Sequence, residues 1–259
     1  MSRNFFVEGL NISEGSAVIT GDAVNHIKNV LRLSAGDEIT LFNRDDPEGK
    51  YAYRAEITDI TRDEVRCRVL FVKEADIRLP YSVTLLQCLP KSGKMELVIQ
   101  KCTELGISRV IPVLSDRSVS RPDGKKALSR AERWRTVAEE AAMQARRSDI
   151  PEVTEIQSFR EALRLAEDAD VKIIPYELSK GFKRTREIID GMRPGQSVAM
   201  IIGPEGGFTP EEVQAANDAG FESISLGRRI LRTETAALVV MSWLMFRGEE
   251  DGENTPITK

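Results

Sequence analysis

The chain has 259 residues, of which 41% are hydrophobic and 30% are charged, and its formal net charge at pH 7 is -4. This composition is typical of a folded globular protein and excludes an intrinsically disordered chain. The longest apolar stretch, 236–246, is much shorter than the roughly 20 residues that span a bilayer, and residues 1–8 lack the apolar core of a signal peptide, so we expect a cytoplasmic protein.

Histidine and cysteine are scarce. His26 is the only histidine, and the three cysteines, Cys67, Cys88 and Cys102, are widely spaced. No pair has the spacing of metal ligands, and a lone histidine is more typical of a structural or surface position than of a catalytic pair with serine or cysteine. We therefore expect buried, reduced thiols and no metal ion.

Residues 1–72 show the short alternating segments of antiparallel strands, separated by turn residues. In the last segment, alternate residues from Val65 to Phe71 are expected to share one face. Asp22 is placed to cap a helix over 23–31. The pattern predicts a small β-barrel with one helix. The predicted strands are 17–19, 38–42, 51–60 and 64–72.

The charged, proline-bearing passage 73–81 is the predicted linker, and the periodicity changes after it. Apolar runs alternate with segments of helical period up to residue 247, and the polar residues 248–259 are expected to form a flexible tail. This alternation indicates an α/β domain with a parallel sheet covered by helices on both faces. The predicted strands are 83–89, 110–114, 171–176, 197–202 and 224–226, and the predicted helices are 92–105, 127–147, 184–189, 210–219 and 233–246.

A glycine-rich turn, 203–207 (GPEGG), follows the predicted strand 197–202. It lacks the lysine of a nucleotide-binding P-loop and the G-x-G-x-x-G spacing of a dinucleotide fold, so a phosphate cradle is disfavoured. Thr209, Pro210 and Glu212 have the pattern of a capping box at a helix start. A plain turn before a capped helix and a ligand loop both remain compatible with this stretch.

The second short strand ends in a basic loop, 227–232 (GRRILR), which leads into an apolar helix that opens with Glu234 and Thr235. In open α/β sheets, ligands bind beyond the carboxyl ends of strands. Two such ends close together in the sequence therefore predict one pocket.

These two stretches, IGPEGG at 202–207 and LGRRILRTETA at 226–236, resemble the SPOUT methyltransferases, and more narrowly the ribosomal RNA small subunit methyltransferase E family. The opening RNFFV at 3–7, the segment HIKNVLRL at 26–33 and the segment KSGKMELVIQKCTEL at 91–105 also resemble this family. One passage departs from it: at 139–147 the chain carries Met143 and Ala145 where such proteins commonly have polar residues.

The resemblance implies a PUA-like barrel followed by a catalytic domain with a deep trefoil knot. It also implies a homodimer, S-adenosyl-L-methionine as methyl donor, and methylation of N3 of a uridine in 16S rRNA of the small ribosomal subunit. Backbone groups and apolar side chains are expected to form the cofactor site. The residues assigned to it are Glu177, Leu178, Ile202, Gly203, Pro204, Glu205, Gly206, Gly207, Leu226, Gly227, Ile230, Leu231, Thr235 and Ala236.

The catalytic candidates follow from the chemistry that this reaction needs. Uridine N3 must lose a proton before it attacks the methyl group, and the developing charge on the base needs stabilisation. Arg232 is the candidate for charge stabilisation and Glu234 the candidate for proton acceptance, with Glu205 as a further acidic candidate. A carboxylate that only caps the helix is an equally good reading of Glu234.

Local basic clusters offset the acidic total charge and are expected to contact phosphates. Two other functions stay open: a SPOUT enzyme that acts on another RNA, and a ribosome-associated RNA-binding protein without catalysis. The residues assigned to RNA are Arg3, Lys28, Arg32, Arg117, Arg121, Arg146, Arg147, Arg228 and Arg229.

Overall fold

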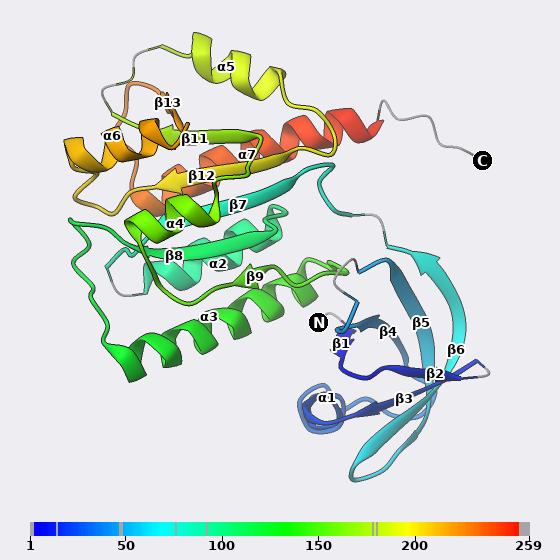
Figure 1. Ribbon diagram of the computed structural model, residues 1–259. Helices are drawn as coiled ribbons and strands as arrows, with labels where there is room; N and C mark the ends of the chain where they lie inside the picture. Colours follow the sequence, from blue (N-terminus) through cyan, green and yellow to red (C-terminus); the bar gives the residue numbers. More distant parts are fainter. Residues whose placement is uncertain are drawn as a thin grey trace. The chain divides into compact units, whose positions relative to one another are not determined.

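The computed structural model describes residues 3–13, 15–46, 49–75, 77–91, 93–177, 179 and 181–253 (Figure 1). The chain folds into two compact units. The N-terminal unit comprises Met1–Ile77 together with Glu139–Ile150, and the second unit comprises Arg78–Ala138 and Pro151–Lys259. The predicted boundaries at residues 72 and 82 lie close to this division, whereas the return of 139–150 to the N-terminal unit has no counterpart in the prediction.

The N-terminal unit contains a six-stranded sheet in the order β1-β4-β5-β6-β3-β2. The pairing of β1 with β4 is parallel, and the other neighbours are antiparallel. Ile19, Leu41, Ile57 and Val65 point into its core and are fully buried. The strands are β1 (Asn4–Val7), β2 (Asn11–Ser13), β3 (Ser16–Thr20), β4 (Glu38–Asn43), β5 (Tyr51–Ile60) and β6 (Glu64–Glu74).

The helix of this unit differs from the prediction at its start. α1 spans Asp22–Asn25 and continues as the π-helix η1 over His26–Val30. The N-cap is Gly21, whose φ of 71° suits glycine, and no side chain caps the helix. Asp22 is therefore the first helical residue and not the cap. His26 packs against the ring of Phe5, which supports its structural interpretation.

The alternation in β6 is interrupted by a β-bulge. Ala55 of β5 pairs with Val69, but the preceding Arg54 pairs with Phe71, so Leu70 is the extra residue. The prediction that Phe71 shares the buried face of Val65 is wrong, because the bulge reverses the alternation and leaves Phe71 55% exposed.

The segment Glu139–Ile150 explains one departure from the family pattern. Ala142 is fully buried in a cluster with Phe6 and Phe42, and Met143 packs against this cluster. The apolar side chain of Met143 therefore serves the core of the N-terminal unit. Glu139 also pairs with Arg44 of the loop after β4.

The second unit contains a parallel sheet in the order β10-β8-β7-β12-β11-β13, with β9 paired to β8. Every pairing is parallel, which confirms the predicted α/β sheet. The two central strands are β7 and β12, and β12 lies between β7 and β11. The strands are β7 (Ser82–Cys88), β8 (Arg109–Leu114), β9 (Glu152–Val153), β10 (Gln157–Ser158), β11 (Val171–Pro175), β12 (Ser197–Ile202) and β13 (Glu222–Ile224).

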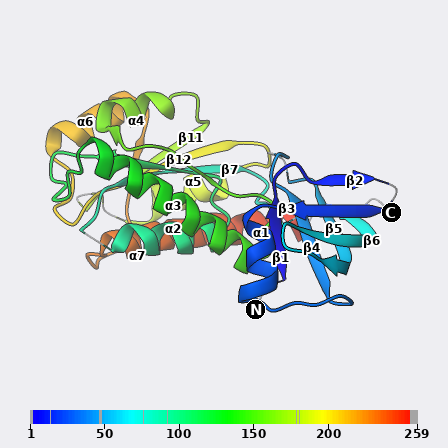
Figure 2. The same ribbon diagram turned by 90° about the horizontal axis from the view of Figure 1, so that it is seen from below.

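Helices cover both faces of this sheet (Figure 2). One face packs against α2, α3, α5 and α7 around Ile99, Trp134 and Met241, and the other packs against α4 and α6 around Leu163 and Ala216. The helices are α2 (Lys94–Glu104), α3 (Gly124–Gln144), α4 (Phe159–Leu165), α5 (Lys183–Asp190), α6 (Pro210–Asp218) and α7 (Thr233–Glu253). α7 extends past residue 247, the predicted end of the domain.

Candidate functional site

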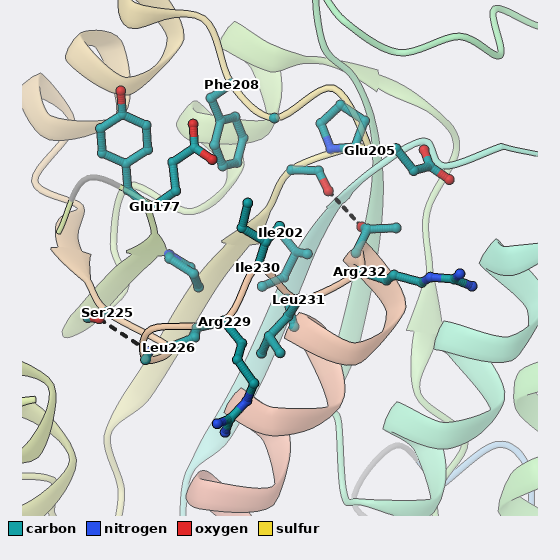
Figure 3. Close-up of a pocket in the computed structure, with 18 of the residues that line it drawn as sticks. Glu177, Ile202, Glu205, Phe208, Ser225, Leu226, Arg229, Ile230, Leu231 and Arg232 are labelled. Atoms are coloured by element: carbon teal, nitrogen blue, oxygen red, sulfur yellow. Dashed lines mark hydrogen bonds between the residues drawn. The ribbon is translucent and has the colours of Figure 1, made fainter. Parts of the chain in front are cut away.

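A pocket of about 480 Å³ lies beyond the carboxyl ends of β11, β12 and β13, against the start of α7 (Figure 3). It occupies the position at which open parallel sheets bind ligands, and its volume lies within the roughly 300–1,000 Å³ of small-molecule sites. Its walls are Pro175, Tyr176, Glu177, Ile202, Gly203, Pro204, Glu205, Gly206, Gly207, Phe208, Ser225, Leu226, Gly227, Arg228, Arg229, Ile230, Leu231, Arg232, Thr233 and Ala236.

The glycine-rich turn forms one wall, and at two of its glycines a side chain would have little room. A Cβ on Gly203 would lie 3.0 Å from the ring of Phe208, and one on Gly206 would lie 3.1 Å from the Cβ of Arg117. Gly207 has a φ of 68° and donates its N–H to the carbonyl of Pro204, which closes the turn. Backbone atoms therefore line this side of the pocket.

The predicted capping box then fixes the start of α6. Thr209 Oγ1 accepts from the N–H of Glu212, and the Glu212 carboxylate accepts from the N–H of Thr209. The same carboxylate accepts from the N–H of Asp116 in the loop after β8. The glycine-rich turn is thus held between a well-capped helix and a neighbouring loop.

The loop after β13 forms the opposite wall. Ser225 Oγ accepts from the N–H of Gly227, whose φ of 104° again requires glycine. Leu226 and Leu231 are partly buried against the core, whereas the Ile230 side chain is 89% exposed. This wall therefore offers apolar surface to the pocket and to its mouth.

Thr233, the first residue of α7, joins the two walls. Its Oγ1 donates to the carbonyl of Gly203 at 2.6 Å, the bond drawn in Figure 3. It also accepts from Nε2 of Gln87, at 2.9 Å, on the central strand β7. No local sequence signal marks this pair, because Gln87 and Thr233 are 146 positions apart.

Three charged side chains gather beside the glycine-rich turn. Lys94 Nζ of α2 lies 2.8 Å from the Glu205 carboxylate and 3.3 Å from that of Glu234. The Glu205 carboxylate also accepts from the N–H of Lys91. Burial works to raise the pKa of Glu205, but the bonds from Lys94 and Lys91 outweigh it, so the pKa lies below its ordinary value. The bond to Glu205 likewise raises the pKa of Lys94.

The structure brings most of the predicted cofactor residues together around the pocket. Thr235 does not line it, and Leu178 lies outside the described residues. Of the catalytic candidates, Arg232 lines the pocket and is exposed, while Glu234 lies outside the lining and is paired with Lys94. The sequence did not single out Pro175, Tyr176, Phe208, Ser225 or Thr233.

The predicted RNA contacts of the second unit fall into two groups. Arg228 and Arg229 are exposed at the pocket mouth, and in Figure 3 Arg229 extends away from the glycine-rich turn. Arg117 donates to the carbonyl of Gly206 at 2.9 Å, and Arg121 donates to the carbonyls of Ser115 and Asp116. Arg117 and Arg121, the second group, therefore stabilise the loop beside the pocket.

In the N-terminal unit, the prediction that Arg147 contacts RNA requires a correction. Its side chain is 7% exposed and lies 2.6 Å from the Asp149 carboxylate, so it is not presented to a ligand. The neighbouring Arg146 is exposed, with a left-handed φ of 60°. Arg3 pairs with Asp37 at 3.0 Å, and Lys28 and Arg32 are exposed.

The described part of the chain offers neither a membrane span nor a metal site. None of its helices is both long and apolar enough to cross a bilayer. No cluster of three or more His, Cys, Asp or Glu side chains within the same residues is arranged to hold a metal ion.

The comparisons with known proteins agree with this architecture. Residues 78–245 match the RNA methyltransferase domain family, and residues 19–70 match the RNA methyltransferase PUA domain family. Ribosomal RNA small subunit methyltransferase E of Bacillus subtilis is 37% identical over 234 residues, which cover 89% of this chain and 90% of the relative. The protein of the same name from Mycobacterium bovis is 34% identical over 244 residues, which cover 92% and 88%.

A solved structure extends the likeness to three dimensions. Ribosomal RNA small subunit methyltransferase E of Neisseria gonorrhoeae, bound to S-adenosyl methionine, has a TM-score of 0.80 and 31% identity to this chain, and the match covers 94% of this chain and 96% of the other. The predicted order, a PUA-like domain followed by an α/β methyltransferase domain, is therefore confirmed. The chain belongs to the ribosomal RNA small subunit methyltransferase E family.

Proposed function

We propose that this protein is an S-adenosylmethionine-dependent methyltransferase that acts on N3 of a uridine in 16S rRNA. The observation that carries the proposal is the pocket, because the two stretches that resemble the family form its facing walls. The relatives from Bacillus subtilis and Mycobacterium bovis are named for methylation of small subunit rRNA, and the Neisseria gonorrhoeae structure holds the methyl donor.

The pocket has the chemistry that an adenosyl group requires. Apolar side chains from the loop after β13 suit a flat base, and the glycine-rich turn lets backbone N–H and C=O groups approach a ligand closely. When bound, S-adenosylmethionine supplies an electrophilic methyl group on a sulfonium ion. We assign the lining residues predicted from the sequence to this cofactor, except Thr235.

The residues that flank Thr233 are our candidates for action on the base. Arg232 is part of the pocket lining and is exposed, and in Figure 3 its side chain extends away from the loop after β13. We assign its guanidinium the stabilisation of negative charge on a uracil oxygen. Glu234 remains the candidate for accepting the N3 proton, and its pairing with Lys94 holds the carboxylate beside the first residue of α2. N3 lies on the Watson–Crick edge, so the uridine must be unpaired or flipped out to reach the pocket.

We further propose a cytoplasmic homodimer whose catalytic domain contains a trefoil knot and whose N-terminal unit binds RNA. Exposed apolar side chains in the second unit support self-association: Ile230 is 89% exposed, Phe246 65% and Phe182 50%. α7 is apolar around its circumference near its start, a pattern that requires cover on more than one side.

The test is mass spectrometry of 16S rRNA nucleosides. Small subunits from cells that lack the protein are expected to lack one 3-methyluridine, and the purified protein with S-adenosylmethionine is expected to restore it. Glu234→Gln serves as the matched variant: it is expected to bind S-adenosylmethionine and to leave the uridine unmodified. Persistence of 3-methyluridine in the deletion cells would refute the substrate, and normal turnover by Glu234→Gln would remove Glu234 as the base.

A further inference from the structure

Gln87 is a fully buried polar residue on the central strand β7. Its Nε2 donates to Thr233 Oγ1 at 2.9 Å and to the carbonyl of Cys88 at 3.0 Å. Its Oε1 is buried and has no hydrogen-bond partner among the described residues. A buried amide oxygen without a hydrogen-bond partner destabilises the fold. Any stabilising contribution of the Gln87 side chain therefore comes from the hydrogen bonds that its Nε2 donates.

The direction of the hydrogen bonds between these residues is determined by their chemistry. The carbonyl of Gly203 can only accept, so the Thr233 hydroxyl must donate its one proton there. The hydroxyl can then only accept from Gln87, which requires Nε2, and not Oε1, to face it. The chain of bonds therefore runs from Gln87 to Thr233 to Gly203.

This chain connects three elements at the pocket. Gln87 pairs in register with Ile202, the last residue of β12 before Gly203. Thr233 is the first residue of α7 and stands between Arg232 and Glu234. Through Thr233, the Gln87 side chain is therefore connected to the glycine-rich wall and to the start of α7, where Arg232 and Glu234 lie.

We propose that Gln87 is a positioning residue that acts through Thr233 to set the distance between the two walls of the pocket. This inference rests on the proposed function, because it takes S-adenosylmethionine as the ligand between those walls. Loss of the chain of bonds would let α7 and the glycine-rich turn move apart and would weaken cofactor binding before any chemistry takes place.

Calorimetric titration with S-adenosylmethionine tests the proposal. Thr233→Val keeps the shape of the side chain but removes the hydroxyl, and is expected to lower affinity about tenfold. Thr233→Ser keeps the hydroxyl and is expected to bind within about twofold of the wild type. Gln87→Met fills the same space without a donor and is expected to match Thr233→Val.

The double variant and a control separate positioning from general destabilisation. If the bonds act as one unit, Gln87→Met with Thr233→Val binds no more weakly than either single variant. Thr103→Val removes another fully buried hydroxyl, on α2 and outside the pocket lining, and is expected to leave the affinity unchanged whatever its effect on the melting temperature. Should Gln87→Met fail to fold, the valine and serine variants of Thr233 still test the bond to Gly203.

Equal affinity of Thr233→Val and the wild type would overturn the proposal, as would an equal loss of affinity in Thr103→Val or Thr233→Ser. A wild-type protein that does not bind S-adenosylmethionine would instead refute the proposed function. The two failures are therefore distinguishable in one series of titrations.

Discussion

At the scale of single residues, the structure separates side chains of the same type by their surroundings. Arg147 is buried against Asp149, whereas Arg228 is exposed at the pocket mouth. The thiols behave alike: burial raises the pKa of Cys67 to about 11 and that of Cys102 to about 12, in agreement with the expectation of buried, reduced cysteines. Burial and pairing, which the sequence does not display, decide which arginine can meet RNA.

The pairing of Lys94 with Glu205 predicts a pH-dependent contribution to stability. The pKa of Glu205 in the folded protein lies below its ordinary value of 4.5, so the contribution is present above that pH and is lost as the pH falls through the lowered pKa. Lys94→Met is therefore expected to reduce the free energy of unfolding at pH 7, and the difference from the wild type is expected to shrink at acidic pH.

Urea unfolding at neutral and acidic pH measures this difference. Lys101→Met is the control, because Lys101 lies on the same helix and pairs with Glu104 at its surface, where such pairs contribute little. A loss of stability in Lys94→Met that is the same at both pH values would show that the ion pair is not its cause.

At the scale of helices and strands, the sequence predicts the elements in which apolar residues recur with a clear period. The strands β7 and β12 and the helix α2 follow apolar periodicity, and the capping box of α6 follows from Thr209 and Glu212. The short β9 and β10 have too few residues for a period. The bulge at Leu70 and the bond between Gln87 and Thr233 arise from long-range pairing and have no local signal.

The same division holds for the candidate site. The glycine-rich turn and the loop after β13 could be predicted as one pocket, because the parallel strands before them end at one edge. Phe208 and Tyr176 could not, since their place in the lining depends on how the turns fold back on the sheet.

Gly207 gives an element-scale prediction. Gly207→Leu forces a left-handed φ of 68° on a branched side chain, at a cost of roughly 1–2 kcal/mol. Apart from the chain neighbours of Gly207, no atom of the described residues lies within 4 Å of the new Cβ. The added side chain is expected to occupy space at the pocket wall and to weaken S-adenosylmethionine binding.

Gly195→Leu is a matched control, since Gly195 has a φ of 86°, equally open surroundings and a place in the turn before β12. Both variants are expected to lose stability in thermal unfolding, and only Gly207→Leu to lose affinity in calorimetry. Unchanged affinity of Gly207→Leu would contradict the placement of the cofactor.

At the scale of the whole molecule, the net charge of -4 conceals basic clusters that the fold exposes. Arg228 and Arg229 lie together at the pocket mouth and form no ion pair among the described residues. An acidic chain can therefore bind RNA through a local cluster, because charges on protein and phosphate interact within about 10 Å at ordinary salt.

This cluster predicts the salt dependence of RNA binding. The double variant Arg228→Ala with Arg229→Ala is expected to weaken binding to 16S rRNA. It is also expected to make the slope of log affinity against log salt concentration less steep by roughly 1.4, because each phosphate that an arginine no longer neutralises contributes about 0.7. Filter binding over a salt series measures the slope. Arg160→Ala, an exposed change on α4, is expected to leave it unchanged, and a slope unaltered in the double variant would exclude the cluster from the interface.

The sheet order also has a consequence for how the protein is made. β12 inserts beside β7, where Ser197 pairs with Ser82, and the pocket further needs β13 and the start of α7. Pairings so distant along the chain form slowly, and synthesis delivers the N-terminal parts first. The ligand pocket is thus completed only after nearly all of the chain has left the ribosome. A ligand bound there can stabilise the finished fold but cannot guide its earlier steps.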